Sequence, residues 1–140
     1  MTWEPLPDEP DPQPVEVGLH DRLALTRTPP SGGLTVHPAS SPRERHGFGF
    51  EQPVASAPTV PLSDIGVVLV PGMAFDRFGV RLGRGAGHFD RFLPDLVGTA
   101  HLVGVCAEGR VVARLPREPH DIPMTHLLTE RGLYVIPPLD

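Results

Sequence analysis

In the second half of the chain, the apolar positions fall into short runs bounded by glycine, proline and polar residues. Residues 65–70 form a continuous run rich in β-branched side chains, which predicts a strand buried on both faces. Residues 101–107 predict a second buried strand, and residues 133–136 predict a last one. Pro71-Gly72 directly follows the first strand, so a loop leaves its carboxyl end, where open α/β sheets usually bind ligands.

The first half of the chain carries more turn residues and less regular patterning. Residues 22–26 and 34–37 predict two short strands, joined by the proline- and glycine-rich turn 29–33. Residues 46–58 have no sustained period and predict a loop. Residues 1–20 are rich in proline and acidic side chains, which favours extended or irregular chain over helix.

Two segments have the composition of short helices. Residues 89–96 follow a glycine-rich stretch, but Pro94 removes a backbone donor there, so we expect a short or kinked helix. Residues 123–128 predict a second short helix. The order of strand, helix and strand favours an α/β fold with a mostly parallel sheet and flanking helices. We expect residues 1–140 to form a single domain.

Composition narrows the classes of partner and chemistry. The formal net charge of −5 argues against a nucleic-acid or anionic-membrane partner. All 12 basic residues are arginine, which excludes a P-loop lysine, a lysine base and a Schiff base. The single cysteine, Cys106, is expected as a buried thiol, which fits a reducing cytoplasm. We expect no signal peptide and no membrane span, and the seven histidines lack zinc-site spacing.

The stretch with the clearest chemistry is Arg81-Leu-Gly-Arg-Gly-Ala-Gly-His-Phe-Asp-Arg91. Its glycines stand at alternate positions, which lets the backbone turn sharply and bring several N–H groups close to one ligand. A helix starting directly after them would add free N–H groups and the positive end of its dipole, which suits phosphate. Arg84 adds a forked cation, and Asp90 can hold a magnesium ion that bridges phosphates. A nucleotide-phosphate loop is one interpretation, and a glycine-rich surface turn is the other.

Three ordered segments resemble the 5-formyltetrahydrofolate cyclo-ligase family (methenyltetrahydrofolate synthetases). They are Leu69-Val-Pro-Gly-Met-Ala-Phe-Asp-Arg77, the stretch 81–91 just described, and Leu115-Pro-Arg-Glu-Pro-His-Asp121 leading to Glu130. The resemblance implies an α/β fold similar to that of ribose-phosphate isomerases and CoA transferases. It also implies an ATP-dependent ligase that converts 5-formyltetrahydrofolate to 5,10-methenyltetrahydrofolate by phosphorylating the formyl oxygen.

The resemblance places the ATP phosphates on the glycine loop (residues 83–87) and the residues that follow it. Phosphoryl transfer depends mostly on positioning and charge neutralisation, so donors and metal ions matter more than an acid–base pair. Arg81 and Arg91 flank the loop and either support the site or pair with Asp76 or Glu118. The implied ATP-binding residues are Gly83, Arg84, Gly85, Ala86, Gly87, His88, Phe89 and Asp90, of which Arg84 and Asp90 are catalytic.

Metal binding is implied at two carboxylates. Asp90 and Asp121 are the expected ligands of a Mg²⁺ ion that accompanies ATP. His88 and His120 stand close to them in the sequence. Each histidine either contacts phosphate or substrate, or takes no part in the site.

The folate contacts are implied less directly. Glu9 matches the pterin-binding glutamate of the family, or it belongs to a solvated acidic segment. Phe48 and Phe75 line a pteridine or adenine pocket, or they belong to the core. The expected partners are therefore two small molecules, ATP and a folate, bound by a monomer or a homodimer.

The chain also departs from the family pattern. We expect the basic N-terminal helix that supplies a cation to ATP to be missing. Ala86 stands where lysine or glycine is usual, Phe89 replaces the usual tyrosine, and Thr125 replaces an expected acidic residue. Each lost charge-assisted contact costs about 1.5–3 kcal/mol, so two or three together reduce activity by several orders of magnitude. The alternatives are a non-catalytic nucleotide- or folate-binding member, or a chain whose missing segment comes from another subunit.

Overall fold

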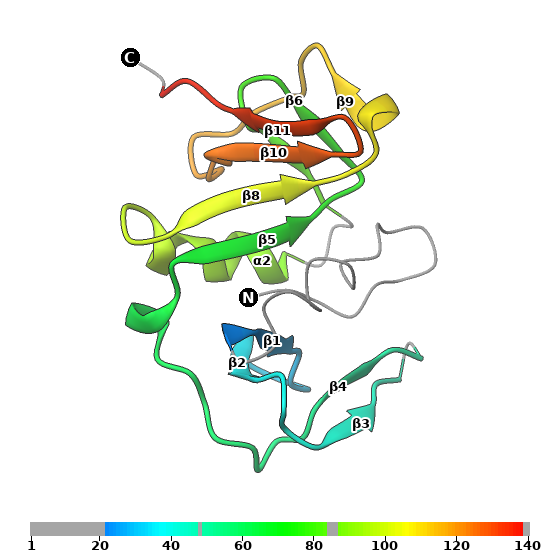
Figure 1. Ribbon diagram of the computed structural model, residues 1–140, viewed down its shortest axis with the longest axis vertical. Coiled ribbons are helices and arrows are strands. Elements are labelled where there is room, and N and C mark those ends of the chain that lie inside the picture. The colour runs from blue at the N-terminus through cyan, green and yellow to red at the C-terminus, as the bar shows by residue number, and fades with distance from the viewer. Residues whose placement is uncertain (1–21, 48, 84–86, 139–140) are drawn as a thin grey trace.

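The computed structural model describes residues 22–47, 49–83 and 87–138. Its centre is a sheet of four strands, β5 (Val67–Pro71), β8 (His101–Val105), β10 (His126–Thr129) and β11 (Gly132–Val135). They are ordered β11–β10–β8–β5 (Figure 1). The first three strands in the sequence are parallel, and β11 runs antiparallel to β10. The predicted α/β fold with a mostly parallel sheet is confirmed, with few helices beside it.

The core lies against one face of this sheet. Val68 and Val70 of β5 have no exposed surface, and Leu102 of β8 is 2% exposed. The strand predicted at residues 65–70 is therefore present, but the prediction that both of its faces are buried was wrong. Val67 is 46% exposed because successive side chains of a strand point to opposite faces and the described helices cover only one of them.

The predicted helix over residues 123–128 is wrong, because the chain forms β10 there. Leu127 is 2% exposed and lies between β8 and β11, where it completes the apolar face of the sheet. Thr125 connects β10 to β8: its Oγ1 accepts the Leu102 N–H at 2.9 Å and donates to Leu102 O at 3.1 Å. Strand pairing thus overrides a local pattern that was too short to distinguish helix from strand.

A second sheet has three short strands, β6 (Ala74–Asp76), β7 (Arg81–Leu82) and β9 (Val111–Val112), in the order β7–β6–β9. These three strands were not predicted from the sequence. β6 and β7 form a hairpin immediately after β5, so the chain folds back on itself before it reaches the glycine loop. The three-stranded sheet therefore determines where that loop lies relative to β5.

The first part of the chain forms two hairpins. β1 (Ala24–Arg27) pairs with β2 (Thr35–Pro38), as predicted for residues 22–26 and 34–37. β3 (Arg43–Arg45) pairs with β4 (Glu51–Pro53), so the loop predicted over residues 46–58 contains a strand. The buried Arg27 joins the hairpins by donating to the Glu44 carboxylate and, at 2.9 Å, to Pro53 O.

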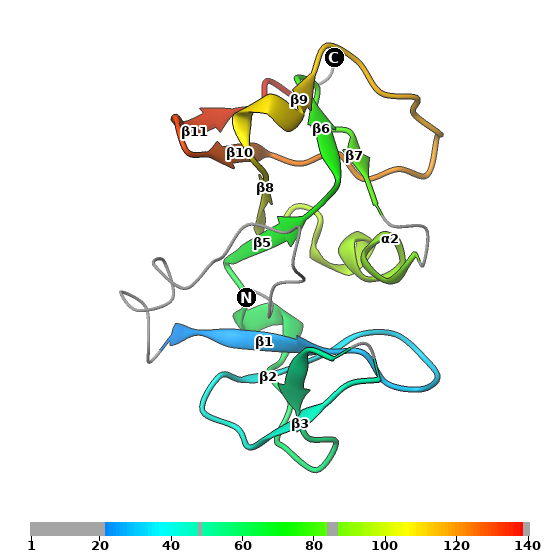
Figure 2. The same cartoon turned by 90° about the vertical axis from the view of Figure 1, so that its right-hand side faces the viewer.

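One short α-helix, α2 (His88–Phe92), continues as the 3-10 helix Leu93–Leu96 with Pro94 in its first turn. The predicted short or kinked helix over residues 89–96 is thereby confirmed, because proline is tolerated in a first turn. Figure 2 shows α2 beside β5, above the β1–β2 hairpin. No helix in the described ranges is both long enough and apolar enough to cross a membrane.

Candidate functional site

The candidate site lies beyond the carboxyl end of β5, where the chain leaves the sheet at Gly72 and returns through β6 and β7. Gly83 directly follows β7, and Gly87 directly precedes α2. Both ends of the glycine loop therefore lie near this edge of the four-stranded sheet. The intervening predicted residues Arg84, Gly85 and Ala86 lie outside the described residues.

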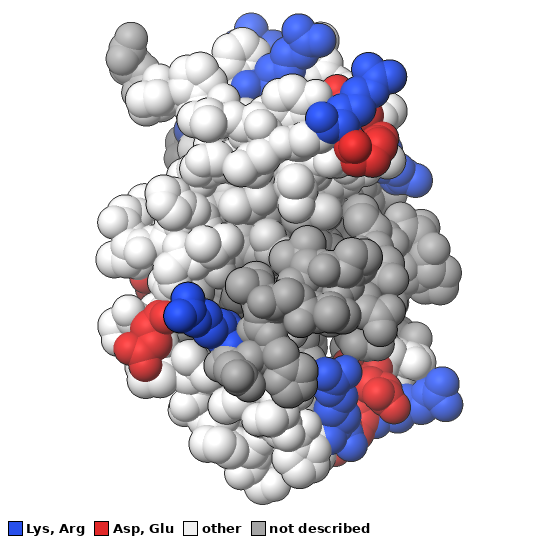
Figure 3. All heavy atoms as spheres, in the orientation of Figure 1, with Lys and Arg blue, Asp and Glu red and all other residues white. Residues whose placement is uncertain are grey.

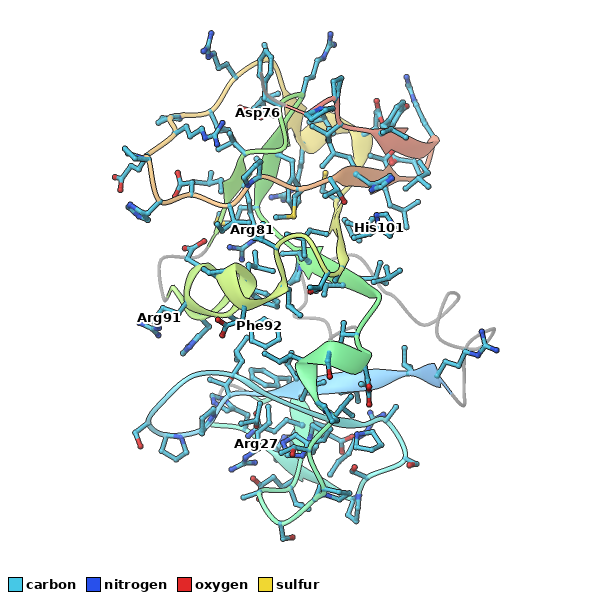
Figure 4. The ribbon with its side chains drawn as sticks, turned by 90° about the vertical axis from the view of Figure 1, so that its left-hand side faces the viewer. Arg27, Asp76, Arg81, Arg91, Phe92 and His101 are labelled. Carbon is cyan, nitrogen blue, oxygen red and sulfur yellow. The ribbon has the colours of Figure 1, made fainter. Side chains whose placement is uncertain are left out.

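Arg81 is the residue that connects the parts of this site. Its Nε donates a hydrogen bond to Pro71 O at 2.7 Å, at the end of β5. Its Nη1 lies 3.7 Å from Asp90 Oδ1, and its Cζ lies 5.2 Å from the ring centroid of Phe89. Figure 4 shows the Arg81 side chain between the second sheet and α2. The guanidinium thus contacts the central sheet and the helix that carries Asp90.

Asp76 has a different role from the ion-pair partner that the sequence suggested. Its carboxylate is buried, and Oδ1 accepts the N–H groups of Phe78 and Val80, each at 2.9 Å. Oδ2 accepts the N–H of Leu115 at 2.9 Å. The predicted pairing of Arg81 with Asp76 is wrong, because backbone donors surround this carboxylate. Asp76 instead holds the turn between β6 and β7 against Leu115, where the third resembling segment begins. The Asp-x-x-Gly sequence of residues 76–79 was the available signal.

Gly83 and Gly87 are the described glycines of the loop, and each position requires glycine for a different reason. A Cβ on Gly83 would lie 2.8 Å from Arg81 Nη1, so the Gly83 backbone rests directly on the guanidinium. Gly87 has φ of +73°, in the left-handed region that favours glycine, and precedes the first residue of α2. Since α2 spans five residues, little of the predicted dipole effect on phosphate can come from it.

Asp90 lies in the first turn of α2 with its side chain 56% exposed. It therefore presents a carboxylate to solvent beside the Arg81 guanidinium. His88 and Arg91 form a separate contact on the same helix, with His88 Nδ1 3.4 Å from Arg91 Nη2. Figure 4 shows Arg91 directed away from Arg81, so the two arginines that flank the loop have different surroundings.

Asp121 lies in a tight turn after β9. Its Oδ2 accepts the Glu118 N–H at 2.8 Å, and its side chain is 31% exposed. His120 Nε2 lies 3.2 Å from Glu118 Oε2 and 3.8 Å from Asp121 Oδ1, so Glu118 pairs with this histidine and not with Arg81 as the sequence had allowed. Magnesium is commonly bound through one or two carboxylates plus phosphate oxygens, and the donor chemistry of Asp90 and Asp121 fits that pattern.

No group of three or more His, Cys, Asp or Glu side chains that could hold a metal occurs in the described ranges. Mg²⁺ binding at the two aspartates therefore stays a prediction. It depends on the oxygen atoms that ATP would bring, since the described residues alone supply fewer ligands than a metal-only site requires.

Of the three residues predicted to contact folate, the structure describes Phe75. Phe75 is fully buried, and its ring occupies space left by two glycines: a Cβ would lie 2.8 Å from the ring at Gly72 and 2.5 Å from it at Gly104. Of the alternatives left open for Phe75, the structure therefore places it in the core and not at a ligand surface. Glu9 and Phe48 lie outside the described residues.

A model of the 5-formyltetrahydrofolate cyclo-ligase family matches residues 21–130. The 5-formyltetrahydrofolate cyclo-ligase of Mycolicibacterium smegmatis is 43% identical over 93 residues, which are 64% of this chain and 47% of that protein. The protein of the same name from Haemophilus influenzae is 32% identical over 63% of this chain and 48% of its own length. The chain thus spans about half the length of these relatives.

Two solved structures resemble the fold. The structure of Aquifex aeolicus 5,10-methenyltetrahydrofolate synthetase has a TM-score of 0.79 and 30% identity, and the match covers 99% of this chain and 72% of that one. A 5,10-methenyltetrahydrofolate synthetase from Mycoplasma pneumoniae has a TM-score of 0.66 at 17% identity, with 90% and 70% of the two chains covered. The second likeness concerns the fold alone.

Proposed function

Since the chain belongs to the 5-formyltetrahydrofolate cyclo-ligase family, we propose that it uses ATP to convert 5-formyltetrahydrofolate to 5,10-methenyltetrahydrofolate. The observation that carries the proposal is the convergence of Gly83, Phe89 and Asp90 on Arg81 at the carboxyl end of β5. All of these residues lie within the matched range. Ligands of α/β proteins usually bind at this end of the strands.

The proposed reaction has two bond exchanges. The formyl oxygen attacks the γ-phosphorus of ATP, and the bond from that phosphorus to ADP breaks. N10 of the folate then attacks the activated formyl carbon, loses its proton, and expels inorganic phosphate that carries the former formyl oxygen. The protein's part is to position the reactants and stabilise charge, as in phosphoryl transfer generally.

The residues of the loop have distinct proposed tasks. Backbone N–H groups from Gly83 to Gly87 cradle the phosphates, and Arg84 supplies a cation to the transferred group. Asp90 and Asp121 would hold the Mg²⁺ that accompanies ATP. That ion, when bound, neutralises the phosphate charge that otherwise repels the incoming oxygen.

For the folate we propose Glu9 and Phe48 as contacts, on the resemblance alone. Phe75 has no exposed surface, so its task is to support Gly72, where the chain leaves β5. A protein of this kind would act in the cytoplasm as a monomer or a homodimer. Size-exclusion chromatography with light scattering distinguishes the two states.

A second candidate is a binding protein that holds nucleotide or folate without turnover. The observation in its favour is Phe89, whose ring lies under the Arg81 guanidinium and has no hydroxyl to offer a phosphate. It predicts measurable affinity with no product. The two candidates therefore differ in turnover and not in binding.

The test combines both readouts on the full chain. The protein is mixed with Mg-ATP and 5-formyltetrahydrofolate, and the methenyl product is followed by its near-ultraviolet absorbance, with a reaction lacking ATP as control. Product that requires ATP supports the ligase. Calorimetric binding of either ligand without product would favour the binding protein, and neither binding nor product would reject both.

A further inference from the structure

Arg81 is largely buried, with its side chain 12% exposed, although guanidinium groups are costly to bury without partners. The hydrogen bond from Nε to Pro71 O, 2.7 Å long, fixes the inner edge of the guanidinium to the end of β5. Because the Arg side chain branches from β7, this bond also fixes β7 relative to the central sheet. The guanidinium is therefore held in place in the free protein, without a ligand.

The same guanidinium group also lies against Gly83 and against two residues of α2, Phe89 and Asp90. The Phe89 ring centroid lies 5.2 Å from Cζ, within the range of a cation–π contact. Gly83 approaches so closely that a Cβ would be 2.8 Å from Nη1 and 3.2 Å from Cζ. Gly83, the first residue of the loop, and Phe89 of α2 thus both contact one planar cation.

Asp90 completes the arrangement. Its Oδ1 lies 3.7 Å from Arg81 Nη1, while 56% of the side chain stays exposed. At this distance the interaction is an ion pair and not a hydrogen bond, so it orients the carboxylate without occupying both oxygens. Arginine suits this task better than lysine, because the planar fork can satisfy Pro71 O and face a carboxylate at once.

We propose that Arg81 is a positioning residue for the nucleotide site, acting through Asp90 and not by touching the phosphates. This inference rests on the proposed function for its ligand, but its structural part stands on the free protein. It differs from a purely structural role, in which Arg81 would stabilise the fold and leave nucleotide affinity unchanged.

A double-mutant cycle separates these roles. Dissociation constants for Mg-ATP are measured by calorimetry for the wild type, Arg81→Gln, Asp90→Asn and the double variant. If Arg81 acts through Asp90, each single change weakens binding about tenfold or more, and the double variant lies within about twofold of the weaker single variant. Multiplied effects would mean that Arg81 acts independently of Asp90, as it would by direct contact with phosphate, and an unchanged constant for Arg81→Gln would mean a purely structural role. Either result would overturn the proposal.

A matched control is Arg114→Gln, which removes another arginine stacked on a phenylalanine, with Cζ 5.5 Å from the Phe78 ring centroid. It is expected to leave the Mg-ATP constant within about twofold of wild type, since Arg114 has no described contact with the loop. Arg81→Lys keeps the charge but loses the fork, so its affinity should lie between those of wild type and Arg81→Gln. Full recovery by lysine would contradict the positioning role of the fork.

A measurement on the free protein, without nucleotide, tests the role of Arg81 independently of the proposed function. In amide NMR spectra of the free protein, Arg81→Gln should shift the resonances of Gly83, Phe89 and Asp90, whereas Arg114→Gln should not. If wild type binds no Mg-ATP but these shifts occur, the proposed function fails and the positioning contacts stand. If the three resonances do not move, the positioning proposal fails whatever the nucleotide result.

Discussion

The chain has arginine and no lysine, and among the described residues Arg27 and Arg81 are largely buried in the fold. Arg27 donates to Glu44 and Pro53 O and so joins the two N-terminal hairpins, while Arg81 joins β5, the glycine loop and α2. In both places one guanidinium contacts a carboxylate and a backbone carbonyl. A lysine ammonium is a point charge on a flexible stem and reproduces neither arrangement.

Two arginines of the stretch 81–91, Arg84 and Arg91, should differ in their effect on nucleotide binding. Arg84→Ala removes the cation proposed to contact phosphate, whereas Arg91→Ala removes a side chain that contacts His88 at 3.4 Å and points away from Arg81. We expect Arg84→Ala to weaken Mg-ATP binding by about 1.5–3 kcal/mol and Arg91→Ala by clearly less. Calorimetry checks this, and the reverse order would mean that the phosphates are placed wrongly.

Cys106 should be an unreactive thiol at neutral pH. Burial, followed by the negative charges of Glu108 and Glu130, raises the pKa of the Cys106 thiol to about 11. The thiolate therefore forms only above about pH 10, and alkylation by iodoacetamide at pH 8 should be slow in the native protein and fast in denaturant. Mass spectrometry measures the extent. Equal rates in the two conditions would show that the thiol is accessible in the native fold.

The same shift has a consequence for stability. A free cysteine thiol has a pKa of about 8.5, so the folded pKa of about 11 is the higher one. The stabilising contribution of the neutral thiol is complete below about pH 8.5 and is lost as the pH rises toward 11. Cys106→Ser should reduce this fall in the free energy of unfolding, measured by urea titration between pH 8 and pH 10. An unchanged slope with pH would contradict the raised pKa.

At the scale of elements, the second sheet crosses the central one at a point where glycine is required. Phe75 of β6 lies so close to Gly104 of β8 that a Cβ there would be 2.5 Å from the ring. Gly104→Ala should destabilise the protein by about 1–3 kcal/mol through overpacking. Gly66→Ala, at a site where a Cβ meets nothing within 4 Å, is the matched control and should stay within about 0.5 kcal/mol.

Urea titrations of the two glycine variants give the comparison. A loss at Gly104→Ala no larger than that at Gly66→Ala would show that Phe75 can move aside. β6 could then leave the end of β5 at a different angle without cost. The position of the glycine loop would in that case not depend on this contact.

The elements that the sequence predicted correctly have strong local signals. The β-branched run at 65–70 and the proline at position 94 determine β5 and the broken helix after the loop. β6, β7 and β9 have only two or three residues each, too few for a period to appear. β10 was predicted as a helix because its four residues acquire their structure by pairing with β8 and β11.

The same distinction applies to the site. The glycine spacing and Asp90 are adjacent in the sequence, so the loop could be located from the sequence alone. The partner of Arg81 could not, because it depends on the β6–β7 hairpin that turns the side chain from Asp76 toward α2. Asp76 itself was misjudged because its three backbone donors come from residues 78, 80 and 115, and the last is distant in sequence.

At the scale of the whole molecule, α2 connects the sheets to the N-terminal hairpins. Phe92 is 6% exposed, belongs to the same core as Ala24 and Val36, and points from α2 toward β1 in Figure 4. Phe92→Ala should cost about 3–5 kcal/mol, whereas Phe78→Ala, at a position 46% exposed, should cost about 1 kcal/mol or less. Thermal unfolding followed by calorimetry checks both, and a separate early transition of the hairpins would show that α2 does not couple them.

The face shown in Figure 3 carries both positive and negative side chains, and neither sign dominates it. Arginine and acidic side chains lie next to one another at its upper right and lower right edges. The proposed ligands are both anionic, so their attraction must come from the local group at the glycine loop and not from the net charge of −5. Binding of Mg-ATP should accordingly weaken only modestly as salt rises, compared with binding that depends on a long-range field.

The most direct test of the proposed chemistry follows the formyl oxygen. 5-Formyltetrahydrofolate labelled with oxygen-18 in its formyl group is incubated with Mg-ATP and the full chain, and the released phosphate is analysed by mass spectrometry. Phosphorylation of the formyl oxygen predicts methenyl product together with phosphate that carries the label. Methenyl product with unlabelled phosphate, or no ATP-dependent product at all, would contradict the account.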